Sequence, residues 1–271
     1  MCYTDNDTYF MLKKKYRGIE RRNIGLPNRM DGKMTDSYVC IDLETTGLNP
    51  KTDRIIEIGI VRVQDNEVVQ EWETLVNPGR NLEERITELT GIKDEQLVSA
   101  PTVEEVLPTL LEIAGDNPLL GHGVLFDYSF VKKAAVNRKM VFEKDGIDTL
   151  RIARKYLTDL ESRGLGYLCK YYGINHNAHR ALGDARATVE LYRKLTELFY
   201  EKEEMQGDKS LFRPKRLCYH AKRETPITIP QKEQLYKLAD KHKLILDYDI
   251  AKLTRSEASR RIDRILAEYG R

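Results

Sequence analysis

VCIDLETTGL, residues 39–48, combines the composition of a buried strand with two acidic side chains. Successive side chains of a β-strand alternate between the two faces of a sheet, so Asp42 and Glu44 share one face and Leu43 lies on the other. Two carboxylates on one face of an apolar strand repel each other, and burial adds a desolvation cost. The stretch therefore predicts a strand whose acids need a cation: an arginine, a structural salt bridge or a metal ion.

Two more strands are expected directly after the first, which we place at 38–43. Residues 54–63 and 68–76 carry apolar runs typical of strands, and the DNE stretch at 65–67 fits a hairpin turn between them. This pattern predicts three consecutive antiparallel strands.

Helical and strand patterns then alternate. A helix is expected near 103–114, a short buried strand at 118–122, and another helix starting near Phe126. In ALGDARATVELYRKLTELFY, residues 181–200, apolar side chains recur every three or four positions and predict a long amphipathic helix. Together these elements predict an α/β fold with a mixed β-sheet flanked by helices.

The 271 residues allow one domain of ordinary size and a small appendage. We expect a basic arm at 1–36, the main domain at 37–204, a linker at 205–216 and a small helical C-terminal module at 217–271. In that module Thr254 precedes Glu257 by three residues, the spacing of a capping box at a helix start.

Composition limits the location and the class of the protein. The hydrophobic fraction of 41% and charged fraction of 32% fit a globular chain, and no apolar run approaches the ~20 residues of a membrane span. The first residues lack the order of a secretory signal, and the four cysteines are scattered, which favours the reducing cytoplasm. Residues 208–271 hold 16 basic against 9 acidic side chains, whereas 37–207 hold 21 against 29. Basic flanks on an acidic body fit contact with a polyanion, although solvated tails are often charged too.

Three further residues extend the acidic pattern of the first strand. Asp127 opens the helix after the fourth strand, Asp184 lies in the first turn of the long helix, and His179 precedes it by five residues. An Asp near a helix start is often only a cap. The order of the three blocks along the chain carries the information.

This order resembles the DEDD superfamily of 3′→5′ exonucleases, in the variant with a histidine base. The chain looks similar to the proofreading family of the DNA polymerase III epsilon subunit and the exonuclease domain of PolC-type polymerases. The motifs are IDLETTG, GHGVLFD (121–127) and HRALGDA (179–185), and the resemblance spans roughly 37–200. Gly123 departs from the pattern, because the family often has Asn there.

The resemblance implies a ribonuclease H-like fold, two divalent ions (Mg²⁺ or Mn²⁺) and His179 as the general base for the attacking water. The implied metal ligands are Asp42, Glu44, Asp127 and Asp184. Carboxylate-rich sites suit these hard cations, and paired ions can assist phosphoryl displacement. His176 is an alternative base, but the spacing to Asp184 favours His179.

The resemblance also implies contacts with the 3′-terminal nucleotide. The expected substrate-binding residues are Thr45, Thr46, Gly47, Leu48, His122 and Phe126. Gly47 could equally serve the turn that ends the strand, and His122 could pack locally. Glu57 matches no motif, and we expect it to face the surface or to pair locally.

The sequence thus predicts a metal-dependent 3′→5′ exonuclease that releases nucleoside 5′-monophosphates from single-stranded or frayed DNA ends. RNA 3′-end trimming is an alternative, since the motifs do not fix the sugar. A non-catalytic nucleic-acid-binding or polymerase-associated subunit is a second alternative. Partners would be nucleic acid and a DNA polymerase subunit, without a membrane. The C-terminal module could grip nucleic acid, dock a protein or pack back on the main domain.

Overall fold

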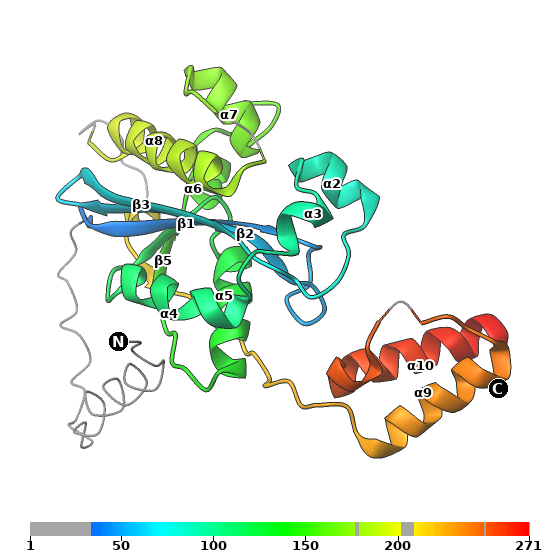
Figure 1. Ribbon diagram of the computed structural model, residues 1–271. Coiled ribbons are helices and arrows are strands. Elements are labelled where there is room, and N and C mark those ends of the chain that lie inside the picture. The colour runs from blue at the N-terminus through cyan, green and yellow to red at the C-terminus, as the bar shows by residue number, and fades with distance from the viewer. Residues whose placement is uncertain (1–33, 177–178, 202–208, 247, 271) are drawn as a thin grey trace, which may run out of the picture. The chain divides into compact units, whose positions relative to one another are not determined.

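The computed structural model describes residues 34–176, 179–201, 209–246 and 248–270, so the arm predicted at 1–36 lies outside them except for its last three residues. The described chain forms a six-stranded sheet of order β3-β2-β1-β4-β5-β6 (Figure 1). The strands are β1 (Tyr38–Thr45), β2 (Ile55–Gln64), β3 (Glu67–Leu75), β4 (Leu119–Gly121), β5 (Asp145–Asp148) and β6 (Lys215–Arg216).

The sheet is mixed, as predicted. β1, β2 and β3 form an antiparallel meander, and β4 and β5 add to the other side of β1 in parallel. Asp65 and Asn66 join β2 to β3 with φ of 52° and 65°, the left-handed values that a two-residue hairpin turn needs. The predicted hairpin is therefore confirmed.

Helices cover both faces of the sheet (Figure 1). The helices of the main body are α2 (Glu84–Thr90), α3 (Asp94–Leu97), α4 (Val103–Ala114), α5 (Leu125–Asn137), α6 (Thr149–Tyr156), α7 (Leu165–Tyr172) and α8 (Ala181–Phe199). No helix of the described residues is both long and apolar enough to cross a membrane.

The alternating side chains of β1 divide the core into two clusters. Val39, Ile41 and Leu43 pack with α4 and α5, whereas Tyr38 and Cys40 pack with α6, α7 and α8. By the period of two, Asp42 and Glu44 belong to the face that α8 covers. The sheet thus directs both acids toward the start of that helix.

Residues 209–216, expected to be part of a linker, contribute to the sheet. A 3₁₀ turn, η1 (Lys209–Phe212), buries Phe212 completely, and β6 pairs antiparallel with β5. Phe212 lies against Tyr156, Tyr192 and Tyr200, with ring centroids 5.5–6.4 Å away. The predicted boundaries of the domains stay a prediction.

The C-terminal module has a small apolar core of its own. It contains α9 (Ile229–His242), the 3₁₀ turn η2 (Ile250–Lys252) and α10 (Arg255–Tyr269). Leu235, Leu238, Ile262 and Ile265 are buried between the two helices. The predicted capping box is confirmed, because Glu257 accepts from the backbone and hydroxyl of Thr254 at 2.9 Å.

Candidate active site

The two acids of β1 meet the first turn of α8. One carboxylate oxygen from each of Asp42, Glu44 and Asp184 lies within 4.8 Å of the others. Asp42 and Glu44 are partly buried and Asp184 is buried. Residues that are 140 positions apart in the sequence therefore form one acidic cluster.

Asp127 reaches the same strand from the first turn of α5. Its Oδ1 accepts a hydrogen bond of 3.0 Å from the backbone N–H of Leu43, the residue between Asp42 and Glu44. Asp127 is buried, and it lies outside the group of three whose oxygens converge within 4.8 Å. The fourth predicted ligand thus adjoins the cluster and also fixes the β1 backbone.

Burial and mutual repulsion disfavour the charged forms of these acids. Desolvation, followed by the charges of Asp127 and Asp184, raises the pKa of Asp42 well above its ordinary value. Desolvation likewise raises the pKa of Glu44 to about 7 and the pKa of Asp127 to about 8. Within the part of the chain that the structure describes, no lysine or arginine forms an ion pair with Asp42 or Glu44. The cation that the sequence requires is not an arginine among these residues, and an all-carboxylate set suits divalent metal ions.

Two histidines contact the carboxylate of Asp184, one at each oxygen. The Nε2 atom of His176 contacts Oδ1 of Asp184, and the backbone N–H of His179 donates to Oδ2 at 3.0 Å. His179 is exposed and has a φ of 64°, a left-handed conformation that is uncommon for a residue with a side chain. The geometry brings the ring of His176, and only the backbone of His179, onto the carboxylate.

Comparisons with known proteins identify the family of this chain. A family model described as "Exonuclease" matches residues 39–192. The chain belongs to this family. It is a 3′→5′ exonuclease with the DEDD fold, and divalent metals are the cofactors of such enzymes.

Two bacterial relatives illustrate the match. The chain is 38% identical to the DNA polymerase III epsilon subunit of Aquifex aeolicus over 169 residues, which are 62% of this chain and 84% of that protein. It is 39% identical to the PolC-type DNA polymerase III of Clostridium perfringens over 165 residues, 60% of this chain. The chain spans only 11% of that second relative.

Solved structures show the same fold. An exonuclease I structure matches with a TM-score of 0.55 at 19% identity, covering 60% of this chain and 41% of that one. A 3′-exonuclease that recognises a histone mRNA stem-loop matches with a TM-score of 0.53 at 18% identity, covering 61% and 83%. Identities this low support the fold alone.

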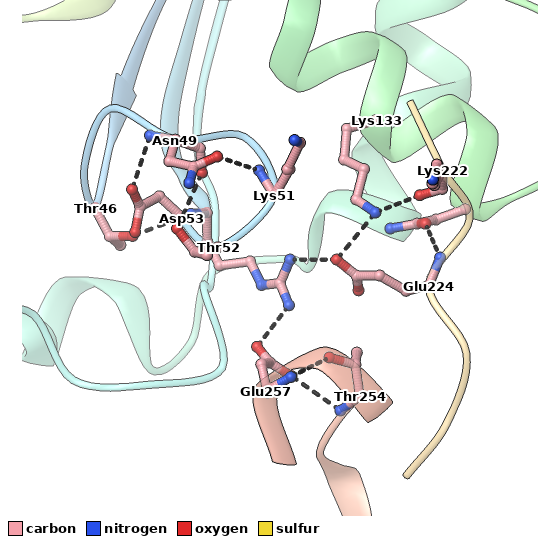
Figure 2. Close-up of polar contacts among 12 residues, drawn as sticks. Thr46, Asn49, Lys51, Thr52, Asp53, Lys133, Lys222, Glu224, Thr254 and Glu257 are labelled. Carbon is pink, nitrogen blue, oxygen red and sulfur yellow. Dashed lines mark hydrogen bonds and ion pairs between the residues drawn. The ribbon is translucent and has the colours of Figure 1, made fainter. Parts of the chain in front are cut away.

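In this exonuclease the loop after β1 is held by internal hydrogen bonds. Thr45 donates to the carbonyl of Gly47 at 2.7 Å, and the Thr46 hydroxyl accepts from the backbone of Arg54 at 3.0 Å and from the Arg80 guanidinium. Figure 2 shows Thr46, Asn49 and Asp53 close together in this loop.

Gly47 lies in a crowded part of this loop, whereas the side chain of Leu48 is exposed to solvent. A Cβ atom on Gly47 would lie 2.5 Å from Oδ2 of Asp53, so a side chain here would have to displace that carboxylate. Leu48 is 85% exposed. The loop therefore offers an apolar side chain, while both threonine hydroxyls are engaged within it.

His122 packs locally. Its Nδ1 lies 2.9 Å from the Thr149 hydroxyl and its Nε2 lies 2.8 Å from the carbonyl of Arg163. Burial lowers its pKa. Phe126 is partly buried beside Phe130, with ring centroids 5.0 Å apart. It directly precedes Asp127 in the sequence.

Glu57 was expected to face the surface or to pair locally, but it is buried and its partner, Arg180, is distant in the sequence. It lies opposite Glu44 in the register of β1 and β2 and is 1% exposed. Its Oε1 accepts from Nε and Nη2 of Arg180 at 3.0 and 2.7 Å, and its Oε2 accepts from the backbone of Ala181 at 2.9 Å. Glu57 thus caps the N-terminus of α8, and this helix carries Asp184.

Gly59, two residues farther on the same face of β2, explains how closely α8 approaches. A Cβ atom there would collide with the backbone of Ala181 and Leu182. The sequence signal for the pairing of Glu57 was its place inside a strand that is apolar on both faces, because a buried acid needs a partner.

Proposed function

We propose that this exonuclease hydrolyses the terminal phosphodiester of single-stranded or frayed DNA 3′ ends and releases nucleoside 5′-monophosphates. The observation that supports this most directly is the acidic cluster: three carboxylates converge, and no lysine or arginine among the described residues forms an ion pair with Asp42 or Glu44. Such a cluster destabilises a folded protein unless it binds cations, so its chemistry favours a metal-dependent function.

Two divalent ions, Mg²⁺ or Mn²⁺, would be held by Asp42, Glu44, Asp127 and Asp184. When bound, such ions neutralise the carboxylates and stabilise the charge that develops on the scissile phosphate. The carboxylates offer only oxygen ligands, which these ions prefer.

His179 would accept a proton from the attacking water at an imidazole nitrogen. Its backbone N–H donates to Asp184, which fixes the position of His179 relative to this acid. His176 is the alternative, favoured by its direct ring contact with Asp184.

The loop Thr45–Leu48 and Phe126 would hold the terminal nucleotide. Leu48 supplies exposed apolar surface for the base, and Phe126 supplies an aromatic ring. Thr45, Thr46 and Gly47 would present backbone groups, since their side chains are engaged or absent.

A polymerase partner is proposed for this chain from its relatives. Their printed names are those of DNA polymerase III proteins, and the chain corresponds to a small part of the PolC-type relatives. We place this activity in the bacterial cytoplasm, where replication occurs.

A side-by-side digestion of matched DNA and RNA oligonucleotides tests the proposal. Both would carry a 5′ label and be digested with Mn²⁺, with Mg²⁺ or with EDTA, and Asp42→Ala would serve as the inactive control. We expect a ladder of shortened DNA that EDTA abolishes. Faster shortening of RNA would favour the RNA-trimming alternative, and turnover by Asp42→Ala would refute the site.

A further inference from the structure

A basic pocket lies at the C-terminal ends of β4 and β5, apart from the acidic cluster. It has a volume of about 280 Å³ and opens between the start of α5, the end of β5 and the segment that forms β6. Four basic side chains line it: Arg151, Arg213, Lys215 and Arg216. None of the predicted motifs includes them.

The charge of this pocket is positive. Asp148 is the acid that lines it, and one of its oxygens accepts three backbone hydrogen bonds, from Gly123, Leu150 and Arg151, at 3.0–3.3 Å. Arg216 shares its charge with Glu143 at 3.0 Å and Asp145 at 4.0 Å.

The other cations are less compensated. Arg151 and Arg213 form no ion pair with any described residue, and Lys215 donates to the Ser210 hydroxyl at 3.1 Å. Both arginines are exposed. Arg151 belongs to the segment 37–207, which holds 21 basic against 29 acidic side chains, so an arginine there without an acidic partner is unusual.

The pocket lies at the C-terminal ends of the parallel strands β4 and β5, and the acids lie at the C-terminal end of β1. Asp42 follows the part of β1 that pairs with β4, and Asp148 ends β5, two strands away in the order β1-β4-β5. Adjacent strands are about 4.8 Å apart, so the offset across the strands is about 10 Å. By the register, Asp148 shares the face of Leu119, whereas Asp42 shares the face of Cys40, so the two acids lie at the same ends of the strands but on opposite faces of the sheet. Val124 and Leu125, which line the pocket, also lead directly into Phe126 and Asp127.

We propose that this pocket binds a backbone phosphate of the polynucleotide strand, on the 5′ side of the terminal nucleotide. Arginine suits this ligand because its planar guanidinium can donate two hydrogen bonds to one phosphate. The proposal rests on the proposed function, since it assumes that the terminal nucleotide lies at the acids. A strand that enters there would place its next phosphates along the C-terminal ends of these strands.

The test compares a polynucleotide with a substrate that has no second phosphate. Arg213→Ala and Arg151→Ala would be compared with Lys155→Ala, an exposed cation of α6 outside the pocket. Binding of a fluorescent single-stranded oligonucleotide is measured by anisotropy in an Asp42→Asn background at several salt concentrations. Turnover of thymidine 5′-(p-nitrophenyl phosphate) is measured in the background with Asp42 intact.

We expect each pocket variant to raise the Kd for the oligonucleotide about five- to tenfold and to reduce the slope of log K against log salt by about 0.7. Turnover of the small substrate should not change, and Lys155→Ala should leave all values unchanged. Circular dichroism verifies the fold, and Arg213→Lys should restore part of the affinity.

An unchanged Kd and slope in both pocket variants would overturn this proposal while leaving the exonuclease function intact. Failure of the wild-type chain to shorten any oligonucleotide would instead count against the proposed function. The binding measurement would still report on the pocket in that case, because it requires no turnover.

Discussion

Glu57 and Arg180 form a hydrogen-bonded ion pair in which the glutamate is buried and the arginine half exposed, with Oε1 2.7 Å from Nη2. The same carboxylate accepts the N–H of Ala181. This pair therefore fixes the start of α8 against β2. Asp184 lies three residues beyond that start, so its position depends on Glu57.

Glu57→Ala should lower both stability and turnover. Loss of the helix cap and of the buried partner of Arg180 should reduce the free energy of unfolding by about 2–3 kcal/mol. It should also lower kcat more than KM and weaken Mn²⁺ binding. Urea denaturation, kinetics and Mn²⁺ titration measure these effects.

Glu71→Ala is the matched control, because Glu71 also joins the sheet to α8, through Arg186, but in an exposed pair. It should change stability by about 0.5 kcal/mol or less. Equal effects in the two variants would contradict a positioning role for Glu57.

Asp42→Asn should abolish turnover and stabilise the metal-free protein. Removing one charge relieves the repulsion that Asp127, Asp184 and Glu44 exert on this position. The melting temperature without metal should rise by about 2–6 °C, as differential scanning calorimetry can measure. A variant that melts earlier than the wild type while still folding would argue that Asp42 is compensated by a partner.

Stability of the metal-free protein should fall as pH rises from about 5 to 8. The folded pKa of Glu44 is about 7 and that of Asp127 about 8, both raised above the unfolded values. In this window the folded state holds protons that the unfolded state has lost, so the free energy of unfolding decreases with pH. Divalent cations should make the free energy of unfolding less dependent on pH. Thermal melts across pH, with Mn²⁺ or EDTA, measure both slopes, and a flat curve in EDTA would count against the burial of these acids.

His179→Ala should lower kcat by about 10²–10⁴ with little change in KM, the usual range for loss of a general base. His176→Ala should cost less than about tenfold, because its ring contacts a carboxylate that cations would neutralise. Rate profiles against pH distinguish the two, since only loss of the base removes the acidic limb. The opposite order would assign the base to His176.

Arg54→Ala should loosen the C-terminal module. Arg54 donates to Glu224 at 3.1 Å and to Glu257 at 2.8 Å. Lys133 lies 3.3 Å from Glu224, and Figure 2 labels both residues. These partly buried pairs should contribute about 1–2 kcal/mol together. Trypsin should then cut faster after Lys222 and Arg223, whereas the exposed pair of Arg85 should be dispensable. Unchanged cleavage would mean that the module is held by other contacts.

The acids of β1 could be predicted because the strand period alone places Asp42 and Glu44 on one face. Asp184 followed from the order of the motifs, and in the structure one of its carboxylate oxygens lies within 4.8 Å of those of Asp42 and Glu44. The histidines were harder to assign, since both lie in one loop and the path of that loop decides which ring reaches the carboxylate.

Two features lay beyond sequence reasoning for physical reasons. Glu57 could be recognised as an anomaly, but its partner is 123 residues away and depends on the crossing of α8 over Gly59. β6 has only two residues, too few for any periodic pattern, so the sequence predicts only a linker for this segment. Contacts that depend on tertiary packing override such local signals.

The burial of Phe212 determines where a truncated fragment of this enzyme can end. The family match stops at residue 192, yet the aromatic cluster that seals that side of the core is completed 20 residues later. A fragment trimmed to the match would expose Tyr156 and Tyr192 to water and leave β5 as a bare sheet edge prone to aggregation. The shortest fragment worth purifying would therefore extend through β6.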